Sequence, residues 1–257
     1  MSDKSSIQWC DASLNFATGC TKISPGCAHC YSLDRTIPRL QAMGQEKYKN
    51  GTKFTVHEEV MYEPLKWKKP RRIFVNSVSD TFHEEMPNGT LQRFFQNVVS
   101  ATPQHQYLLL TKRPEIMFDF FTGNRVFYPA NMPNVWIGVT AENQEMADKR
   151  LPILKEIPAR IRFVSVEPML GPVDLSAYAE WLDWVIIGCE SGPKRRHVST
   201  EFIESLIVQC KAMGVPVFLK QMEVLGKVVS EPSLRLPEAY GGTQKFLEYP
   251  SDAYAKR

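Results

Sequence analysis

Short apolar runs recur along the chain, and longer amphipathic segments separate them. Most of these runs are continuously apolar rather than alternating, as in YLLLT at 107–111 and WVIIG at 184–188. Continuous apolar character is typical of parallel strands that are covered on both faces. The pattern therefore predicts strands at 14–17, 72–76, 107–111, 135–139, 161–165, 184–188 and 215–219.

The segments between these runs carry apolar residues at helical spacing. The clearest of them are 28–43, 91–100, 114–121, 144–157 and 200–213, and Gly44 and Gly214 follow two of these. Strands that alternate with helices predict βαβ units and a parallel sheet. We therefore expect an α/β fold, a partial or complete (β/α) TIM-type barrel with mostly parallel strands. One domain should span 1–257, with an insertion at 45–67 and a C-terminal extension from 228.

Composition agrees with one such domain. The 257 residues are 43% hydrophobic and 23% charged, and the net charge of +3 is too small to indicate a nucleic-acid-binding protein. Basic runs at 66–72 and 194–196 could still contact phosphates. The sequence contains no apolar run of about 18 residues, and its N-terminus lacks an apolar leader. We therefore expect a cytoplasmic protein with no membrane partner.

Three of the six cysteines lie close together, at Cys20, Cys27 and Cys30. In a reducing compartment, clustered cysteines bind metal more often than they form disulfides. The C-x2-C pair lets two thiolates approach one metal site from a single tight turn, and three thiolates leave one metal position open. A zinc site that takes Cys10 or a distant histidine as its fourth ligand is an alternative. So is a set of three unrelated buried cysteines.

Polar side chains follow nearly every predicted strand. Reactive groups of (β/α) barrels sit at the carboxyl ends of the strands. Here those ends carry the carboxylates Asp80, Glu142, Glu167 and Glu190. The sequence thus predicts a polar pocket at this end of the sheet.

The cysteine segment and the strand ends together resemble a known family. The matching segments are IQWCDA at 7–12, GCTK at 19–22, CAHCY at 27–31, FVNSVSDTFH at 74–83, LTKRP at 110–114, WIGVTAEN at 136–143, SVEPMLGP at 165–172, GCESGP at 188–193 and FLKQ at 218–221. They are similar to those of a phage- and prophage-associated family of radical S-adenosylmethionine-like proteins, distantly similar to spore photoproduct lyase. The resemblance covers roughly residues 7 to 222.

The resemblance implies a partial (β/α) barrel in which Cys20, Cys27 and Cys30 hold a [4Fe–4S] cluster. The fourth iron would bind S-adenosylmethionine (SAM), and one electron would cleave SAM to methionine and a 5′-deoxyadenosyl radical. A flavodoxin or ferredoxin would supply that electron. The substrate is unidentified, with a nucleotide or a nucleic-acid base as the candidate class. The usual spacing is C-x3-C-x2-C, whereas the first gap here is six residues.

The resemblance and the needs of SAM suggest roles for the strand-end residues. The amine, carboxylate and ribose of SAM need hydroxyl, carboxylate and cationic partners. We expect Ser77, Ser79 and Asp80 at the amine, although the usual Gly-Gly-Glu is absent. Lys112 and Arg113 could bind the carboxylate or a substrate phosphate. We expect Thr140, Glu142 and Asn143 at the ribose, and His29 or Tyr31 near the adenine.

Glu167, Glu190 and Cys189 are expected on the substrate side. Cys189 would donate a hydrogen atom to a product radical, or would simply be a small buried hydrophobic residue. Two other functions compete with the radical enzyme. One is a zinc-stapled barrel that binds nucleic acid without redox chemistry, and the other is a cluster-bearing sensor or electron carrier.

Overall fold

The computed structural model describes residues 5–123, 127, 129–240 and 242–250. Its internal contacts divide the chain into two compact units, which are described in turn. Unit 1 comprises Met1–Ile137 and Ile157–Arg160, and unit 2 comprises Gly138–Glu156 and Ile161–Arg257. A single domain over the whole chain stays a prediction.

An eight-stranded sheet is the main element of the fold, with the strand order β1-β4-β5-β6-β7-β8-β9-β10. The pairs β1–β4, β4–β5, β7–β8 and β8–β9 are parallel, and β10 pairs antiparallel with β9. The order follows the chain without the reversal of a doubly wound fold. The predicted α/β class with mostly parallel strands is confirmed. The strands are β1 Ala12–Leu14, β4 Arg72–Val75, β5 Gln106–Thr111, β6 Val135–Thr140, β7 Ile161–Val166, β8 Trp184–Gly188, β9 Val217–Val224 and β10 Lys227–Ser230.

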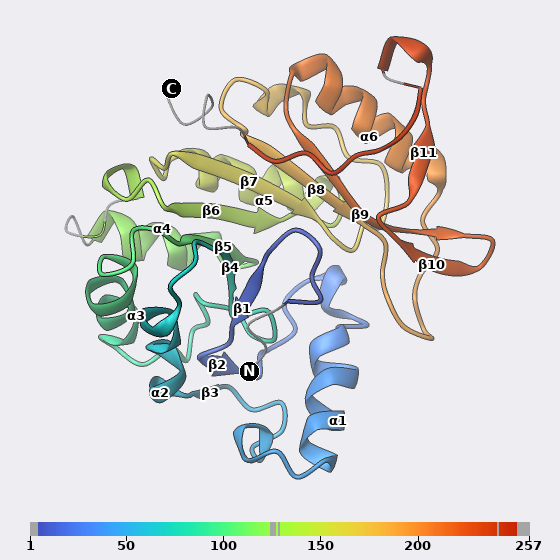
Figure 1. The fold of residues 1–257 in the computed structure, drawn as a ribbon. Coiled ribbons are helices and arrows are strands. Elements are labelled where there is room, and N and C mark those ends of the chain that lie inside the picture. Colours follow the sequence, from blue (N-terminus) through green and yellow to red (C-terminus); the bar gives the residue numbers. More distant parts are fainter. Residues whose placement is uncertain (1–4, 124–126, 128, 241, 251–257) are drawn as a thin grey trace. The chain divides into compact units, whose positions relative to one another are not determined.

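Unit 1 contains β1, β4 and β5 together with short helices (Figure 1). Its core is rich in phenylalanine, and Phe94 and Phe95 make tilted and edge-on contacts with neighbouring aromatic rings. The predicted insertion at 45–67 holds several short elements, and its strand β3 pairs antiparallel with β2. The elements are β2 Ala17–Thr18, β3 Thr55–Val56, α1 Ile37–Ala42, α2 Glu58–Met61, α3 Thr90–Phe94 and α4 Pro114–Gly123, with π-helical turns at Ser32–Thr36 and Phe95–Val99 and 3-10 turns at Pro25–Cys27, Glu46–Tyr48, Glu63–Lys66 and Pro129–Asn131.

Unit 2 contains β7 to β10 with two longer helices, α5 Gln144–Lys155 and α6 Thr200–Met213, and α6 packs against β9 (Figure 1). The predicted extension begins inside the β9–β10 hairpin, and the chain later returns to β9, where Leu219 N donates to Phe246 O. Residues 251–257 of the extension lie outside the described part. The remaining elements are β11 Ser233–Arg235, β12 Thr243–Lys245 and the 3-10 turns Ser176–Tyr178 and Glu238–Tyr240.

Within the described part of the chain, no helix combines the length and the apolar character that crossing a membrane requires.

Candidate functional site

The cysteine loop, residues 19–31, begins at a glycine that no other residue can replace without strain. Gly19 has φ +78°, and a Cβ built on it would lie 2.2 Å from Lys53 O. The next residue, Cys20, donates its backbone N–H to Thr52 O at 3.2 Å. The segment around 52–53 therefore fixes where Cys20 stands.

Gly19→Ala should destabilise this loop. Left-handed backbone strain costs on the order of 1–3 kcal/mol, and the new methyl group would also push against backbone that cannot move far. We expect a lower free energy of unfolding, measured in urea. Gly44→Ala is the matched control, because Gly44 also has positive φ but a methyl group there would meet no atom within 4 Å. Equal behaviour of the two variants would contradict the contact at Lys53.

Tight turns present the other two cysteines. The 3-10 turn Pro25–Cys27 places Cys27, whose N–H donates to Ser24 O at 2.9 Å. Cys30 directly precedes the helical segment, and its carbonyl accepts from Asp34 N at 2.9 Å. All three thiols of the loop are free and partly exposed. The three cysteines are therefore neither disulfide-bonded nor fully buried.

Contacts of Lys22 bridge the six-residue gap between Cys20 and Cys27. Lys22 Nζ donates to Ala28 O at 2.8 Å and pairs with Asp34 at 2.9 Å. Cys20 and Cys30 both pack against one apolar cluster, so the long gap does not separate them. That cluster comprises Leu33, Ile37, Tyr48 and Val78.

The turn after β4 holds the start of the cysteine loop. Asn76 adopts φ 58°, a region that asparagine tolerates better than most residues. Its side chain accepts from Ala17 N at 2.9 Å and donates to Thr81 Oγ1 at 3.1 Å. Ser79 Oγ donates to Gly19 O at 2.5 Å. Ser79, expected at the SAM amine, thus serves as an anchor for the loop.

The same turn also holds the end of the cysteine loop. Tyr31 OH donates to Ser77 O, and Ser32 Oγ donates to Val78 O at 3.0 Å. Ser77 Oγ in turn donates to Asn15 Oδ1 at 3.1 Å. The structure therefore brings Tyr31, Ser77 and Ser79 together around the cysteine loop, and their roles at SAM stay predictions.

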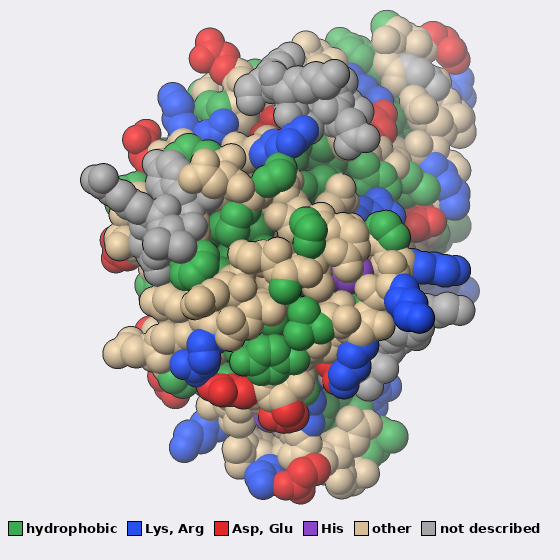
Figure 2. Space-filling view, turned by 60° about the vertical axis from the view of Figure 1, so that its left-hand side comes forward, with side chains coloured by type: hydrophobic (Ala, Val, Ile, Leu, Met, Phe, Trp, Pro, Cys, Tyr) green, Lys and Arg blue, Asp and Glu red, His purple; other side chains and the backbone are tan. Residues whose placement is uncertain are grey.

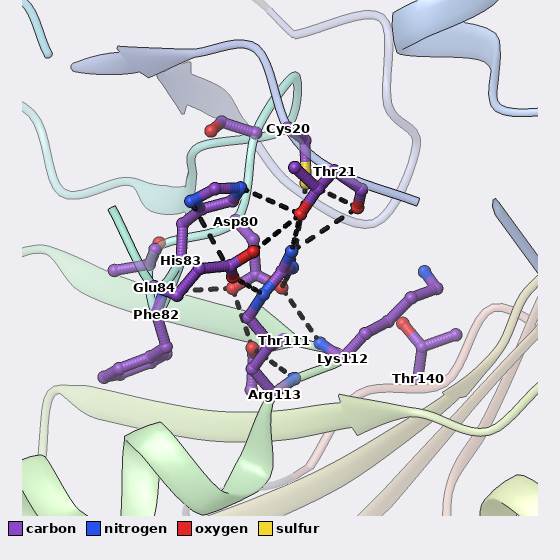
Figure 3. Close-up of polar contacts among 12 residues, drawn as sticks. Cys20, Thr21, Asp80, Phe82, His83, Glu84, Thr111, Lys112, Arg113 and Thr140 are labelled. Carbon is purple, nitrogen blue, oxygen red and sulfur yellow. Dashed lines mark hydrogen bonds and ion pairs between the residues drawn. The ribbon is translucent and has the colours of Figure 1, made fainter. Parts of the chain in front are cut away.

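Asp80 is buried, and hydrogen bonds engage both of its oxygen atoms (Figure 3). Oδ1 accepts from Phe82 N at 2.9 Å and from Thr111 Oγ1 at 2.7 Å. Oδ2 accepts from Lys112 N and from Arg113 Nη1, each at 3.1 Å. A carboxylate offers about four lone-pair sites, so these bonds nearly saturate it. Asp80 joins the turn after β4 to the turn after β5.

Arg113 extends this network to the cysteine loop (Figure 3). Its Nε donates to Glu84 Oε2 at 2.6 Å, and its Nη2 donates to Thr21 Oγ1 at 2.6 Å. Its Nη1 lies 3.7 Å from Cys20 Sγ, within hydrogen-bonding range of sulfur. Thr21 Oγ1 donates its own proton to Glu84 Oε1 at 2.8 Å. One guanidinium therefore contacts a thiol and the residue that follows it.

His83 completes the network from the other side of Thr21. Its Nδ1 accepts from Glu85 N at 3.1 Å, so the neutral ring directs its Nε2–H toward Thr21 Oγ1 at 3.2 Å. The ring stacks on Phe54 with centroids 4.3 Å apart. Burial and the nearby Arg113 cation lower the pKa of His83, which keeps the ring neutral.

Sequence reasoning had not assigned Thr21, His83 or Glu84 to the site. Their signal was weak, because polar residues beside a cysteine or after a strand are common in any loop. The sequence predicts Arg113 only as a partner for a carboxylate or a phosphate. Its contact with Cys20 crosses 93 residues, which no local pattern reveals.

The thiols of Cys20 and Cys27 differ in acidity. Burial, and next the Asp80 carboxylate, raise the pKa of Cys20 to about 11. Burial also acts to raise the pKa of Cys27, but the Lys112 ammonium and hydrogen bonds from the turn outweigh it and lower that pKa. Partial burial opposes ionisation of Glu84, yet hydrogen bonds from Arg113 and Thr21 lower its pKa to about 2.

This difference predicts an order of alkylation in the metal-free protein. The thiolate is the nucleophile, so Cys27 should react faster with iodoacetamide at neutral pH than Cys20. Its rate should fall as the pH drops through a pKa that lies below the ordinary 9.0. Cys210 should stay unreacted until the protein unfolds, because burial raises its pKa to about 12. Mass spectrometry of timed samples checks this, and equal rates at Cys20 and Cys27 would contradict it.

Among the residues that the structure describes, no three His, Cys, Asp or Glu side chains lie close enough together to hold one metal ion. The loop offers three thiols on one segment, and Lys112 and Arg113 lie beside them to balance the negative charge. Iron would deprotonate the thiols on binding.

The expected ribose contacts lie in unit 2, where they make internal contacts. Arg150 Nη1 donates to Glu142 Oε2 at 2.8 Å and to Thr140 O at 2.7 Å. The side chains of Glu142 and Arg150 are 0% and 3% exposed. Asn143 caps α5 by accepting from Met146 N at 3.0 Å. These contacts stabilise the β6–α5 connection.

The residues expected on the substrate side come together within unit 2. Lys220 Nζ lies 2.8 Å from Glu167 Oε1, and Gly188 leaves room for that carboxylate, since a Cβ there would lie 2.4 Å from it. Cys189 follows Gly188 and is buried. Burial, and next the Glu167 carboxylate, raise the pKa of Cys189 to about 11. The thiol therefore keeps its hydrogen at neutral pH, the form that a hydrogen-atom donor needs.

Glu190 has a different environment. Its carboxylate pairs with Arg196 through both oxygens, at 2.6 Å and 3.1 Å, and also accepts from Arg196 N at 2.8 Å. This bidentate arrangement fixes the loop after β8. Glu190 thus acts as a structural anchor in the structure, beside the group formed by Glu167, Cys189 and Lys220.

The basic runs at 66–72 and 194–196 make contacts within the chain. In Figure 2, Lys and Arg side chains stand in several separate groups among acidic and apolar ones. In the run at 66–72, Arg71 stacks over Trp67 and Lys66 pairs with Glu63. In the run at 194–196, Arg195 pairs with Glu223. His29 is half-buried in the turn before Cys30.

Comparisons with known proteins give a family but no activity. No curated protein and no solved structure matches the chain. Residues 4–238 match a family described as proteins of unknown function (DUF5131). Since this match covers most of the chain, the protein belongs to the DUF5131 family.

Proposed function

We propose that this protein is an iron–sulfur enzyme of the radical SAM type, built on a partial (β/α) barrel. The cysteine loop is the observation that carries the proposal. It offers three partly exposed thiols, and cations from the turn after β5 stand beside two of them. A cluster bound by three thiolates keeps one iron for an exogenous ligand.

The chain's own residues divide the work as follows. Cys20, Cys27 and Cys30 hold the cluster, and Lys112 is the candidate partner for the carboxylate of SAM. Asp80 is left out of the SAM contacts, because its oxygens already bind the turn after β5. When bound, the cluster and SAM together supply a 5′-deoxyadenosyl radical after one-electron reduction by a ferredoxin or flavodoxin.

Unit 2 supplies the residues proposed for the substrate. The protonated thiol of Cys189 can donate a hydrogen atom, and Lys220 beside Glu167 can bind an anionic group. A nucleotide or nucleic-acid base is the substrate class that we propose, on the strength of the resemblance to spore photoproduct lyase.

Anaerobic reconstitution with iron and sulfide tests the proposal. We expect about four irons per chain, and release of 5′-deoxyadenosine on addition of dithionite and SAM. Stoichiometric zinc without iron would contradict the proposal and favour a zinc-stapled barrel. A cluster that never yields 5′-deoxyadenosine would identify a sensor or an electron carrier instead.

A further inference from the structure

We propose that Arg113 is a positioning residue that holds the Cys20 thiolate as a cluster ligand and raises the reduction potential of the cluster. The inference rests on the proposed function, since it concerns the same cysteines. It adds a residue from outside the cysteine loop to the machinery of the site.

The guanidinium of Arg113 is fixed on every side. Carboxylates bind its Nη1 and Nε, at 3.1 Å to Asp80 and 2.6 Å to Glu84, and Thr21 accepts from its Nη2. Its side chain is 6% exposed and that of Asp80 is 7% exposed. The planar guanidinium is held at three points, so it cannot turn away from Cys20 Sγ. This sulfur lies 3.7 Å from Nη1. The N–H therefore points at the sulfur before any metal binds.

Such a contact has two consequences for a cluster. An N–H donor to a ligand sulfur, like a nearby positive charge, stabilises the more negative, reduced state and so raises the potential. The donor also orients the thiolate, as residues around metal ligands generally do. The carboxylates of Asp80 and Glu84 pair with Arg113 and offset its charge, so the N–H···S hydrogen bond is the contribution that remains local to Cys20.

Four variants test the inference on the reconstituted full chain. Arg113→Gln removes the charge and shortens the donor, whereas Arg113→Lys keeps a charge without the fork. Arg93→Gln is the matched control, because Arg93 is a partly exposed arginine of unit 1 that pairs with Glu58 instead of a cysteine. The double variant with Asp80→Asn and Arg113→Gln avoids leaving a buried carboxylate without its partner. Each protein is assayed for iron content, for iron loss to a chelator, and for reduction potential by a titration followed with electron paramagnetic resonance.

We expect Arg113→Gln to shift the potential to more negative values and to weaken iron retention roughly 10- to 100-fold. Arg113→Lys should fall between Arg113→Gln and the unmodified chain, and Arg93→Gln should match the unmodified chain. The double variant should also titrate at a more negative potential, by a smaller shift, because it loses the N–H···S bond with no net change of charge. That variant decides the matter if Arg113→Gln fails to fold.

Two negative outcomes are distinguishable. An unmodified chain that binds no iron would overturn this inference and the proposed function together. A full cluster in the unmodified chain, with an unchanged potential in Arg113→Gln and in the double variant, would overturn this inference alone. In that case Arg113 would be a structural ion pair with Asp80.

Discussion

Cys27→Ala should reduce the iron bound after reconstitution from about four per chain to nearly none. Cys27 is partly exposed, and Lys112 lowers the pKa of its thiol against the effect of burial. Cys27 therefore ionises at a lower pH than Cys20. Losing it leaves two thiolates, too few to retain the cluster. Iron and sulfide analysis after desalting, together with the visible absorbance of the cluster, measures the loss.

Cys210→Ala provides the control for this loss. Cys210 is fully buried on α6 and lies outside the cysteine loop, so the variant should keep its iron while losing some packing in the core. Full iron binding by Cys27→Ala would show that this thiol is not a ligand. Equal loss in both variants would indicate that iron retention reports only on the stability of the fold.

Arg150→Leu should lower the free energy of unfolding by about 3–5 kcal/mol, because it strands the buried Glu142 carboxylate without its partner. An unpaired buried ion lowers the free energy of unfolding far more than an intact buried ion pair raises it. Urea denaturation of the two proteins at neutral pH measures the difference.

A double variant separates the role of Glu142 in stability from any role at the ribose. Glu142→Gln combined with Arg150→Leu should regain much of the lost stability, since no buried charge remains. If Glu142 also contacts SAM, the double variant should bind SAM more weakly than the unmodified chain despite its recovered stability. A loss in Arg150→Leu below about 1 kcal/mol would contradict the buried pair.

Much of the fold could be predicted because the signals were local. Helix α6 begins and ends at the predicted residues. Its end was predictable because Gly214 adopts φ 67°, a left-handed conformation that ends helices. Strand β8 matches its predicted run of apolar residues. By contrast, the sequence of 45–67 shows no clear periodicity, because its helices and strands are only a few residues long. This segment supports the cysteine loop through distant contacts, such as that of Thr52 O with Cys20 N, which no local pattern predicts.

The candidate site was harder to predict than the fold. The polar strand ends point to Asp80 and Arg113, but not to Thr21, His83 or Glu84, which belong to the same network beside Cys20. Chemistry alone could not show that the carboxylate of Asp80 would bind Arg113 and that of Glu142 would bind Arg150, because each pairing depends on three-dimensional placement. Both carboxylates were expected to face SAM, and the structure gives both of them arginine partners.

The contact between Cys20 and Arg113, which lie far apart in the sequence, has a consequence for biosynthesis. The three thiols leave the ribosome early, yet the turn that holds Cys20 also needs Thr52, Asp80 and Arg113, the last of them 93 residues downstream. A nascent chain that displays only the cysteines therefore lacks the scaffold that aligns them. If the proposed cluster is delivered by assembly machinery, a competent acceptor exists only after strand β5 and its following turn have been translated and have folded.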